Sequence, residues 1–118
     1  MSDLVKKMKI MQWWKTLPFA KNIQLSWSDK SKKGVWAIAY YARRTIVLYN
    51  IFDCTFESVQ RCVLHEAAHI VQHDTMGYSK HDANFQMINE QLLMEFGTPE
   101  IINSKLSGTI ATSSYKRD

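Results

Sequence analysis

The stretch "VLHEAAHIVQH" (63–73) decides the interpretation of this 118-residue chain, because it places histidines at regular helical spacing. Apolar residues recur with a helical period, which predicts an amphipathic helix over residues 55–73. One side of this helix carries Val59, Val63, Ala67 and Ile70. His65 and His69 lie on the opposite side, one turn apart, so their imidazoles can bind one cation together.

The pattern His65-Glu66-x-x-His69 has a direct chemical interpretation. Neutral imidazole nitrogens suit Zn²⁺, and a catalytic zinc ion takes three protein ligands and keeps one position open. The adjacent Glu66 can act as general base on a water molecule and then protonate a leaving amine. The pattern therefore predicts a catalytic Zn²⁺ site with Glu66 beside it.

The third ligand must come from farther along the chain. His73 continues the histidine row, but on a straight helix it lies about 12 Å from the first histidine, too far to share an ion. Gly77 can end the helix and let the chain double back, which makes His81 the favoured third ligand. Asp82 and Glu90 are the weaker alternatives, because carboxylates also serve as third zinc ligands.

The remaining pattern predicts one α+β domain over residues 1–106, followed by a flexible polar tail at 107–118. Alternating and β-branched segments predict a three-stranded antiparallel sheet, in which two strands form a hairpin. The predicted elements are a helix at 2–17, strands at 22–29, 35–41 and 45–50, a helix at 82–96 and a short helix at 98–106.

Charge is distributed unevenly along the chain. Net charge is +4, but residues 1–50 hold ten Lys or Arg against two Asp, a surplus of eight positive charges, and all four Trp. Basic residues interleaved with aromatic ones can bind nucleic acid, although a solvated basic face over core tryptophans explains the pattern as well.

Cysteine content and hydropathy indicate the redox environment and the cellular location to expect for the chain. Two cysteines, Cys54 and Cys62, are too few for a disulfide framework or a cysteine zinc ribbon, and we expect Cys62 to be a packing residue. The chain lacks a long uncharged apolar run and a secretory signal, so we expect a cytoplasmic protein without a membrane span.

The segment "VLHEAAHIVQHDTMGYSKHDANF" (63–85) resembles the SprT-like zinc metallopeptidase domain, a small zincin-like fold. The resemblance extends by eye over residues 20–96 and includes the hairpin ending in "RRTIVLYN". It implies that His65, His69 and His81 bind zinc and that Glu66 is the catalytic acid/base. It also implies a protein or peptide substrate, since members degrade proteins crosslinked to DNA. Asp82 stands where the family has Gly.

The expected function is therefore zinc-dependent peptide-bond hydrolysis, and the resemblance implies proteins associated with DNA as substrates. An extended substrate would pair with strand 45–50, and Tyr78 or Tyr40 would stabilise the oxyanion. Two alternatives stay open. One is a non-catalytic DNA- or protein-binding module with a structural metal, for which His73 would have to be the fourth ligand. The other is a peptidase resembling the ImmA/IrrE repressor-cleaving group, which has an acidic third ligand.

Overall fold

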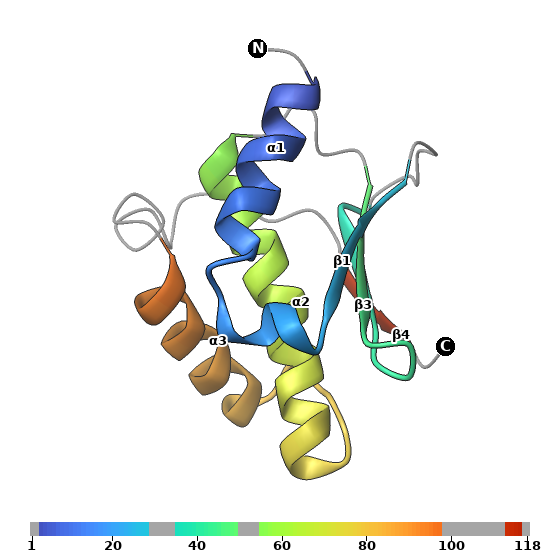
Figure 1. Ribbon diagram of the computed structural model, residues 1–118. Helices are drawn as coiled ribbons and strands as arrows, with labels where there is room; N and C mark the ends of the chain where they lie inside the picture. The colour runs from blue at the N-terminus through green and yellow to red at the C-terminus, as the bar shows by residue number, and fades with distance from the viewer. Residues whose placement is uncertain (1–2, 29–34, 50–54, 98–112, 117–118) are drawn as a thin grey trace.

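The computed structural model describes residues 3–28, 35–49, 55–97 and 113–116, and they form an α+β fold (Figure 1). In chain order the elements are α1 (Asp3–Trp14), the 3-10 helix η1 (Pro18–Lys21), β1 (Gln24–Trp27), β2 (Ala37–Tyr40), β3 (Thr45–Leu48), α2 (Phe56–Met76), α3 (Ala83–Phe96) and β4 (Ser113–Lys116).

The sheet is mixed and four-stranded, with the order β1-β3-β2-β4. β2 and β3 form the antiparallel hairpin that the sequence predicts, but β1 pairs with β3 in parallel, and β4 pairs with β2 in parallel. The prediction of a three-stranded antiparallel sheet is therefore wrong in strand number and in direction. Alternating side chains identify a strand, but they do not specify which neighbour it pairs with or in which direction.

This strand order corrects two further predictions. β3 lies between β1 and β2, so strand 45–50 has no free edge for an extended substrate. Ser113–Lys116, which fall in the predicted flexible tail, form β4 beside β2. The rest of that tail and the predicted helix at 98–106 lie outside the described residues.

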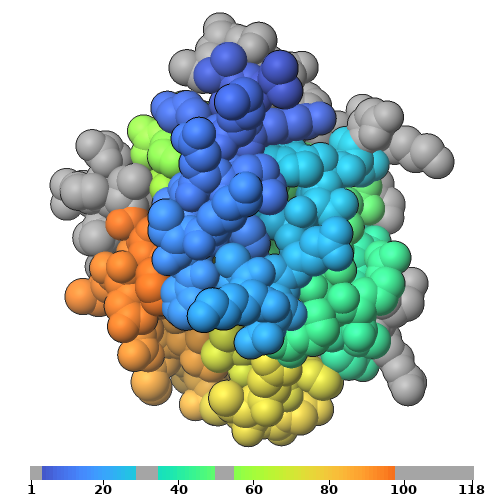
Figure 2. Space-filling view, in the orientation of Figure 1, coloured from blue at the N-terminus to red at the C-terminus, as the bar shows by residue number. Residues whose placement is uncertain are grey.

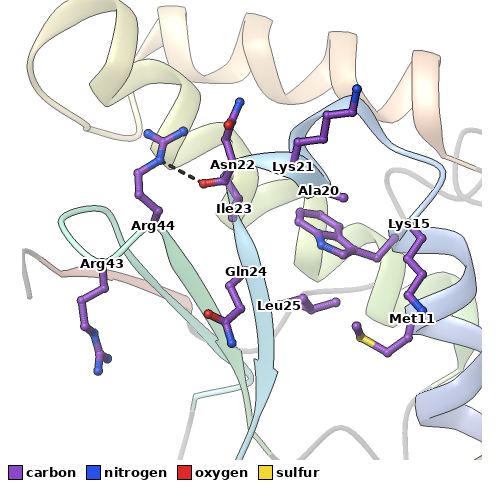
Figure 3. Close-up of a pocket in the computed structure, with 11 residues that line it drawn as sticks. Met11, Lys15, Ala20, Lys21, Asn22, Ile23, Gln24, Leu25, Arg43 and Arg44 are labelled. Atoms are coloured by element: carbon purple, nitrogen blue, oxygen red, sulfur yellow. Dashed lines mark hydrogen bonds between the residues drawn. The ribbon is translucent and has the colours of Figure 1, made fainter.

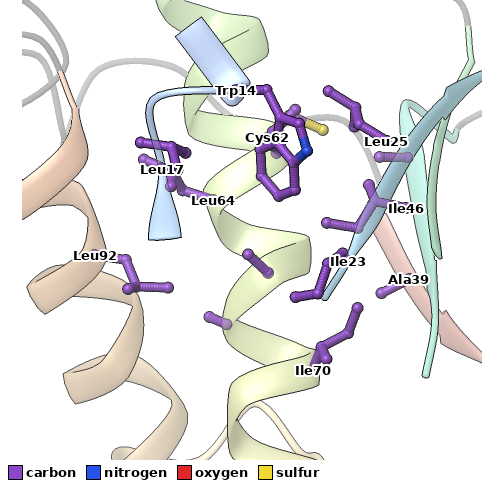
Figure 4. Packing of buried hydrophobic residues seen from close by; sticks show 14 of the residues in the cluster. Trp14, Leu17, Ile23, Leu25, Ala39, Ile46, Cys62, Leu64, Ile70 and Leu92 are labelled. Carbon is purple, nitrogen blue, oxygen red and sulfur yellow. The ribbon is translucent and has the colours of Figure 1, made fainter. Parts of the chain in front are cut away.

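The helices stack on one face of the sheet, with α2 in the middle of the molecule. Figure 4 shows Ile70 and Cys62 of α2 among side chains of the sheet such as Ile46 and Ala39, while Leu92 of α3 approaches from the other side. The four residues predicted for the apolar side of α2 are all buried, at 2% exposure or less. Cys62 is buried in the same core, as predicted.

Short-range signals set the ends of the two long helices. Thr55 caps α2 by accepting a hydrogen bond from the Ser58 N–H at 3.1 Å, and Asp82 caps α3 by accepting one from the Phe85 N–H at 3.0 Å. Gly77 ends α2 in the left-handed conformation, with φ 78°. The chain then reverses, so that α3 packs against α2.

Arg44 closes the β2–β3 turn with an unusual backbone. Its φ is +54°, in the left-handed region, and its guanidinium donates to both Asp74 carboxylate oxygens at 2.6 and 2.8 Å. It also donates to the Asn22 carbonyl oxygen. One side chain thus connects the hairpin turn, the entry to β1 and the last turns of α2.

None of the helices in the described residues combines the length and the apolar character that crossing a bilayer requires.

Candidate metal centre

The turn at Gly77 brings three histidines together. His65 and His69 project from α2 towards α3, and His81 lies just before the first residue of α3. The Nε2 atom of His81 lies 3.0 Å from Nε2 of His69 and 3.3 Å from Nε2 of His65. Within the described part of the chain these three residues form the group that could hold a metal ion.

The spacing of these nitrogens fits a zinc site. Two nitrogens bound to one tetrahedral zinc at about 2.0–2.1 Å lie about 3.3 Å apart, which matches the separations from His81. Three imidazole nitrogens, two from α2 and one from the loop before α3, are also the usual donor set of a zinc ion with an open position. The residues present therefore fit the ion that their pattern predicts.

An aromatic side chain backs the three rings. Phe85 is buried in the first turn of α3, and its ring centroid lies 4.4 to 4.9 Å from those of the three histidines. It stacks on the His69 ring at an interplanar angle of 29°. Phe85 excludes water from one side of the cluster and limits the rotation of the imidazoles.

A chain of hydrogen bonds fixes the tautomer of His69. Its Nδ1 lies 2.7 Å from the Ser79 hydroxyl oxygen, and that hydroxyl donates to Gln72 Oε1 at 3.0 Å. Because the Ser79 hydrogen is used in this way, Ser79 must accept the hydrogen from His69 Nδ1. The Nε2 lone pair of His69 then faces the other two rings, as a metal ligand requires.

Gln72 continues this network. It is fully buried one turn beyond His69, and its amide nitrogen donates to Asp82 Oδ1 at 2.9 Å. Its carbonyl oxygen also accepts from the Lys80 backbone N–H at 2.9 Å. Gln72 thereby joins α2 to the loop that carries His81.

Electrostatics keep the α2 imidazoles neutral. Burial, followed by the neighbouring His81, lowers the pKa of His65 to about 4. Burial, followed by His65 and His81, lowers the pKa of His69 to about 3. Hydrogen bonds from Phe85 N–H, Gln72 and Tyr78 hold the pKa of the Asp82 carboxyl below its ordinary value. Near neutral pH, both α2 rings are therefore in the form that binds metal.

Glu66 lies next to His65 on α2, and its side chain has no exposed surface. A carboxylate is seldom buried in this way in a soluble protein. Its position one residue from a candidate ligand suits a group that acts beside the ion.

The other candidates from the sequence lie elsewhere. The ring of His73 stacks on Tyr41, with centroids 3.9 Å apart, so it is turned towards the hairpin turn. Asp82 caps α3 and holds Gln72, and Glu90 is exposed on α3; neither belongs to the histidine group. A structural site with His73 as fourth ligand therefore has no geometric support in the described residues.

Sequence reasoning did not find Ser79 and Gln72. Gln72 lies three residues after His69, a spacing that puts both on neighbouring parts of one helix face, and this was the available signal.

Of the two tyrosines predicted to stabilise the oxyanion, Tyr78 donates to Asp82 at 3.3 Å and Tyr40 lies beside the Tyr49 hydroxyl at 3.5 Å.

No protein-family model matches the chain, and no curated protein matches it. Among solved structures it is similar to the metallopeptidase zymogen of Pyrococcus abyssi abylysin, with a TM-score of 0.54 and 17% sequence identity. The match covers 90% of this chain and 99% of that one. At this identity the likeness concerns the fold alone.

Proposed function

We propose that this chain is a zinc-dependent peptidase whose ion is held by His65, His69 and His81. The observation that carries the proposal is the convergence of the three imidazole rings. The Nε2 atom of His81 lies 3.0 Å from Nε2 of His69 and 3.3 Å from Nε2 of His65. The buried Glu66 beside them supplies the acid/base group that hydrolysis needs.

The chain's own residues have distinct parts in this reaction. When bound, the ion supplies Lewis acidity, which lowers the pKa of a water molecule and polarises a substrate carbonyl. Glu66 accepts the proton of the attacking water and returns it to the leaving amine. Ser79 and Gln72 hold the His69 ring in its ligating tautomer, and Phe85 covers one side of the rings.

Two observations support a protein or peptide as substrate. The solved structure that resembles this fold is a metallopeptidase zymogen. The segment from His81 to Phe85 resembles the corresponding motif of SprT-like domains, and here Phe85 packs on the histidine rings. Membership of that group is part of the proposal, and action on DNA-associated proteins stays a prediction from the resemblance alone.

The test is the Glu66→Gln variant, measured for zinc content and for cleavage of a denatured protein. Gln has nearly the same shape but cannot accept the proton, so we expect one bound zinc ion per chain and a rate lower by about 100-fold or more. Glu90→Gln, a matched change on the exposed side of α3, should keep both properties. Cleavage at the wild-type rate by Glu66→Gln would refute the assigned role.

A further inference from the structure

A basic hollow lies beside the start of β1. It has a volume of about 480 Å³, within the range of ligand-binding pockets. The end of α1, η1 and the start of β1 form its walls, and the β2–β3 turn closes one end (Figure 3). In Figure 2, α1 and β1 lie next to each other on the face towards the viewer.

The charge of this hollow is one-sided. Its lining includes Lys15, Lys21, Arg43 and Arg44, and no acidic side chain. Arg44 is paired with Asp74. Within the part of the chain that the structure describes, the other three cations form no ion pair. The Arg43 guanidinium lies over the Tyr40 ring, 4.3 Å from its centroid, and Figure 3 shows this side chain turned away from the other lining residues. The charge of the hollow therefore comes from Lys15 and Lys21, and two positive charges beside a concave surface without an acidic partner favour an anionic ligand.

The backbone of β1 offers a second recognition element. The Gln24 N–H donates to the Arg44 carbonyl at 2.8 Å, and the Ser28 N–H donates to the Leu48 carbonyl at 3.0 Å. The even-numbered residues of β1 therefore face β3, which leaves the N–H and C=O groups of Leu25 and Trp27 directed to the outer edge. β1 is an edge strand of the sheet, and Leu25 lines the hollow.

We propose that this hollow is a docking site for an extended acidic peptide segment, which adds to the sheet along the free edge of β1. Main-chain hydrogen bonds would give affinity, and side-chain carboxylates would meet Lys15 and Lys21. A nucleic acid fits less well, because Trp14, the aromatic residue of the lining, is 3% exposed and offers no face for base stacking. The site lies outside the metal centre, so binding there does not depend on the proposed peptidase function.

Charge recognition can be tested by fluorescence anisotropy with a labelled peptide of alternating Glu and Thr, in the Glu66→Gln background to prevent cleavage. We expect saturable binding of this peptide and none of its Gln–Thr analogue. Lys15→Ala with Lys21→Ala should weaken binding about tenfold. The control pair Lys6→Ala with Lys9→Ala removes the same charge from α1 outside the lining and should keep the affinity. Equal losses in the two pairs would overturn the proposal.

Strand addition can be tested on the peptide itself. Methylation of every second peptide nitrogen removes donors from one edge of the extended chain. One of the two alternate methylation patterns should therefore weaken binding about tenfold, while the other leaves it nearly unchanged. Two methylated peptides that both bind as the parent does would overturn the proposal. Displacement of the acidic peptide by oligothymidylate at an equal concentration of negative charge would also overturn the proposal, since it would identify a surface that binds any polyanion.

Discussion

Ser79 is the side chain through which the polypeptide controls the orientation of a candidate zinc ligand. It accepts the hydrogen of His69 Nδ1 and donates its own hydrogen to Gln72. Without this acceptor the ring can rotate or adopt the other tautomer, in which Nε2 carries the hydrogen and cannot ligate. The position of one hydroxyl group therefore affects the metal, although Ser79 is not in the ligand group.

Ser79→Ala should lower zinc affinity by about 10- to 100-fold, the range typical for partners that orient a metal-binding histidine. Competition with a chromophoric chelator at constant pH measures this affinity directly. Ser26→Ala on β1 removes a hydroxyl far from the centre along the chain and serves as control. An unchanged dissociation constant for Ser79→Ala would mean that the ring is held by packing against Phe85 alone.

At the scale of elements, the bend between α2 and α3 determines whether the third histidine reaches the other two. Gly77 takes φ 78°, and a Cβ atom built there meets nothing within 4 Å. A side chain at this position is thus strained by its own backbone and not by crowding. Gly97 ends α3 with φ −79°, a conformation open to any residue.

These two glycines provide a matched pair of substitutions. Gly77→Ala should lower the free energy of unfolding by about 1–2 kcal/mol, the cost of the left-handed conformation for an L-residue. Gly97→Ala should change it by about 0.5 kcal/mol or less. Urea denaturation of both variants tests the difference. An equal effect of the two substitutions would show that the bend does not depend on the special conformation of Gly77.

The helices and the sheet differ in how far the sequence predicts them. The ends of α2 and α3 are set by hydrogen bonds and backbone conformations within a few residues of each cap, so the sequence predicts these ends within three residues. The caps are Thr55, Gly77, Asp82 and Gly97. The approach of His81 to the α2 histidines followed from the same local bend. Strand pairing depends on contacts between distant segments, and for that reason the parallel β1–β3 pair was not predicted.

The hydrogen-bond network escaped prediction for a similar reason. Gln72 and Ser79 become neighbours only after the loop folds back on α2, and neither residue type carries a metal-site signal by itself. The pattern at 65–69 predicts donor atoms, whereas the groups that orient those donors depend on tertiary structure.

At the scale of the whole molecule, α2 connects the two halves of the structure. One side of it packs on the sheet, and another part of its surface carries the buried polar side chains of Glu66, His69 and Gln72, each at 2% exposure or less. Of these, His69 stacks on Phe85 of α3. Burying these polar groups costs desolvation free energy, whereas apolar side chains at the same positions would be buried without this cost. Functional sites commonly depart from the simple apolar pattern in this way.

The two imidazoles of α2 make the stability of the metal-free protein depend on pH. His65 and His69 have pKa values of about 4 and about 3 in the folded chain, whereas an unfolded chain has ordinary imidazoles near 6.5. Between these values the unfolded state binds more protons, so the free energy of unfolding must fall as pH decreases below about 6.5. Above about pH 7.5 both states are deprotonated, and the two rings then add no pH dependence.

Urea unfolding of the chelator-treated protein at pH 7.5, 6.0 and 5.0 should therefore show a progressive loss, about 1–2 kcal/mol for each imidazole by pH 5. The Asp82 carboxyl does not interfere in this window, because its pKa is lowered from an already acidic value. The double variant His65→Gln with His69→Gln should have a flatter profile over the same range, since the groups that take up protons on unfolding are gone. A double variant with the wild-type slope would place the titrating groups elsewhere, and the burial of the two α2 rings would then not be the cause of the pH dependence.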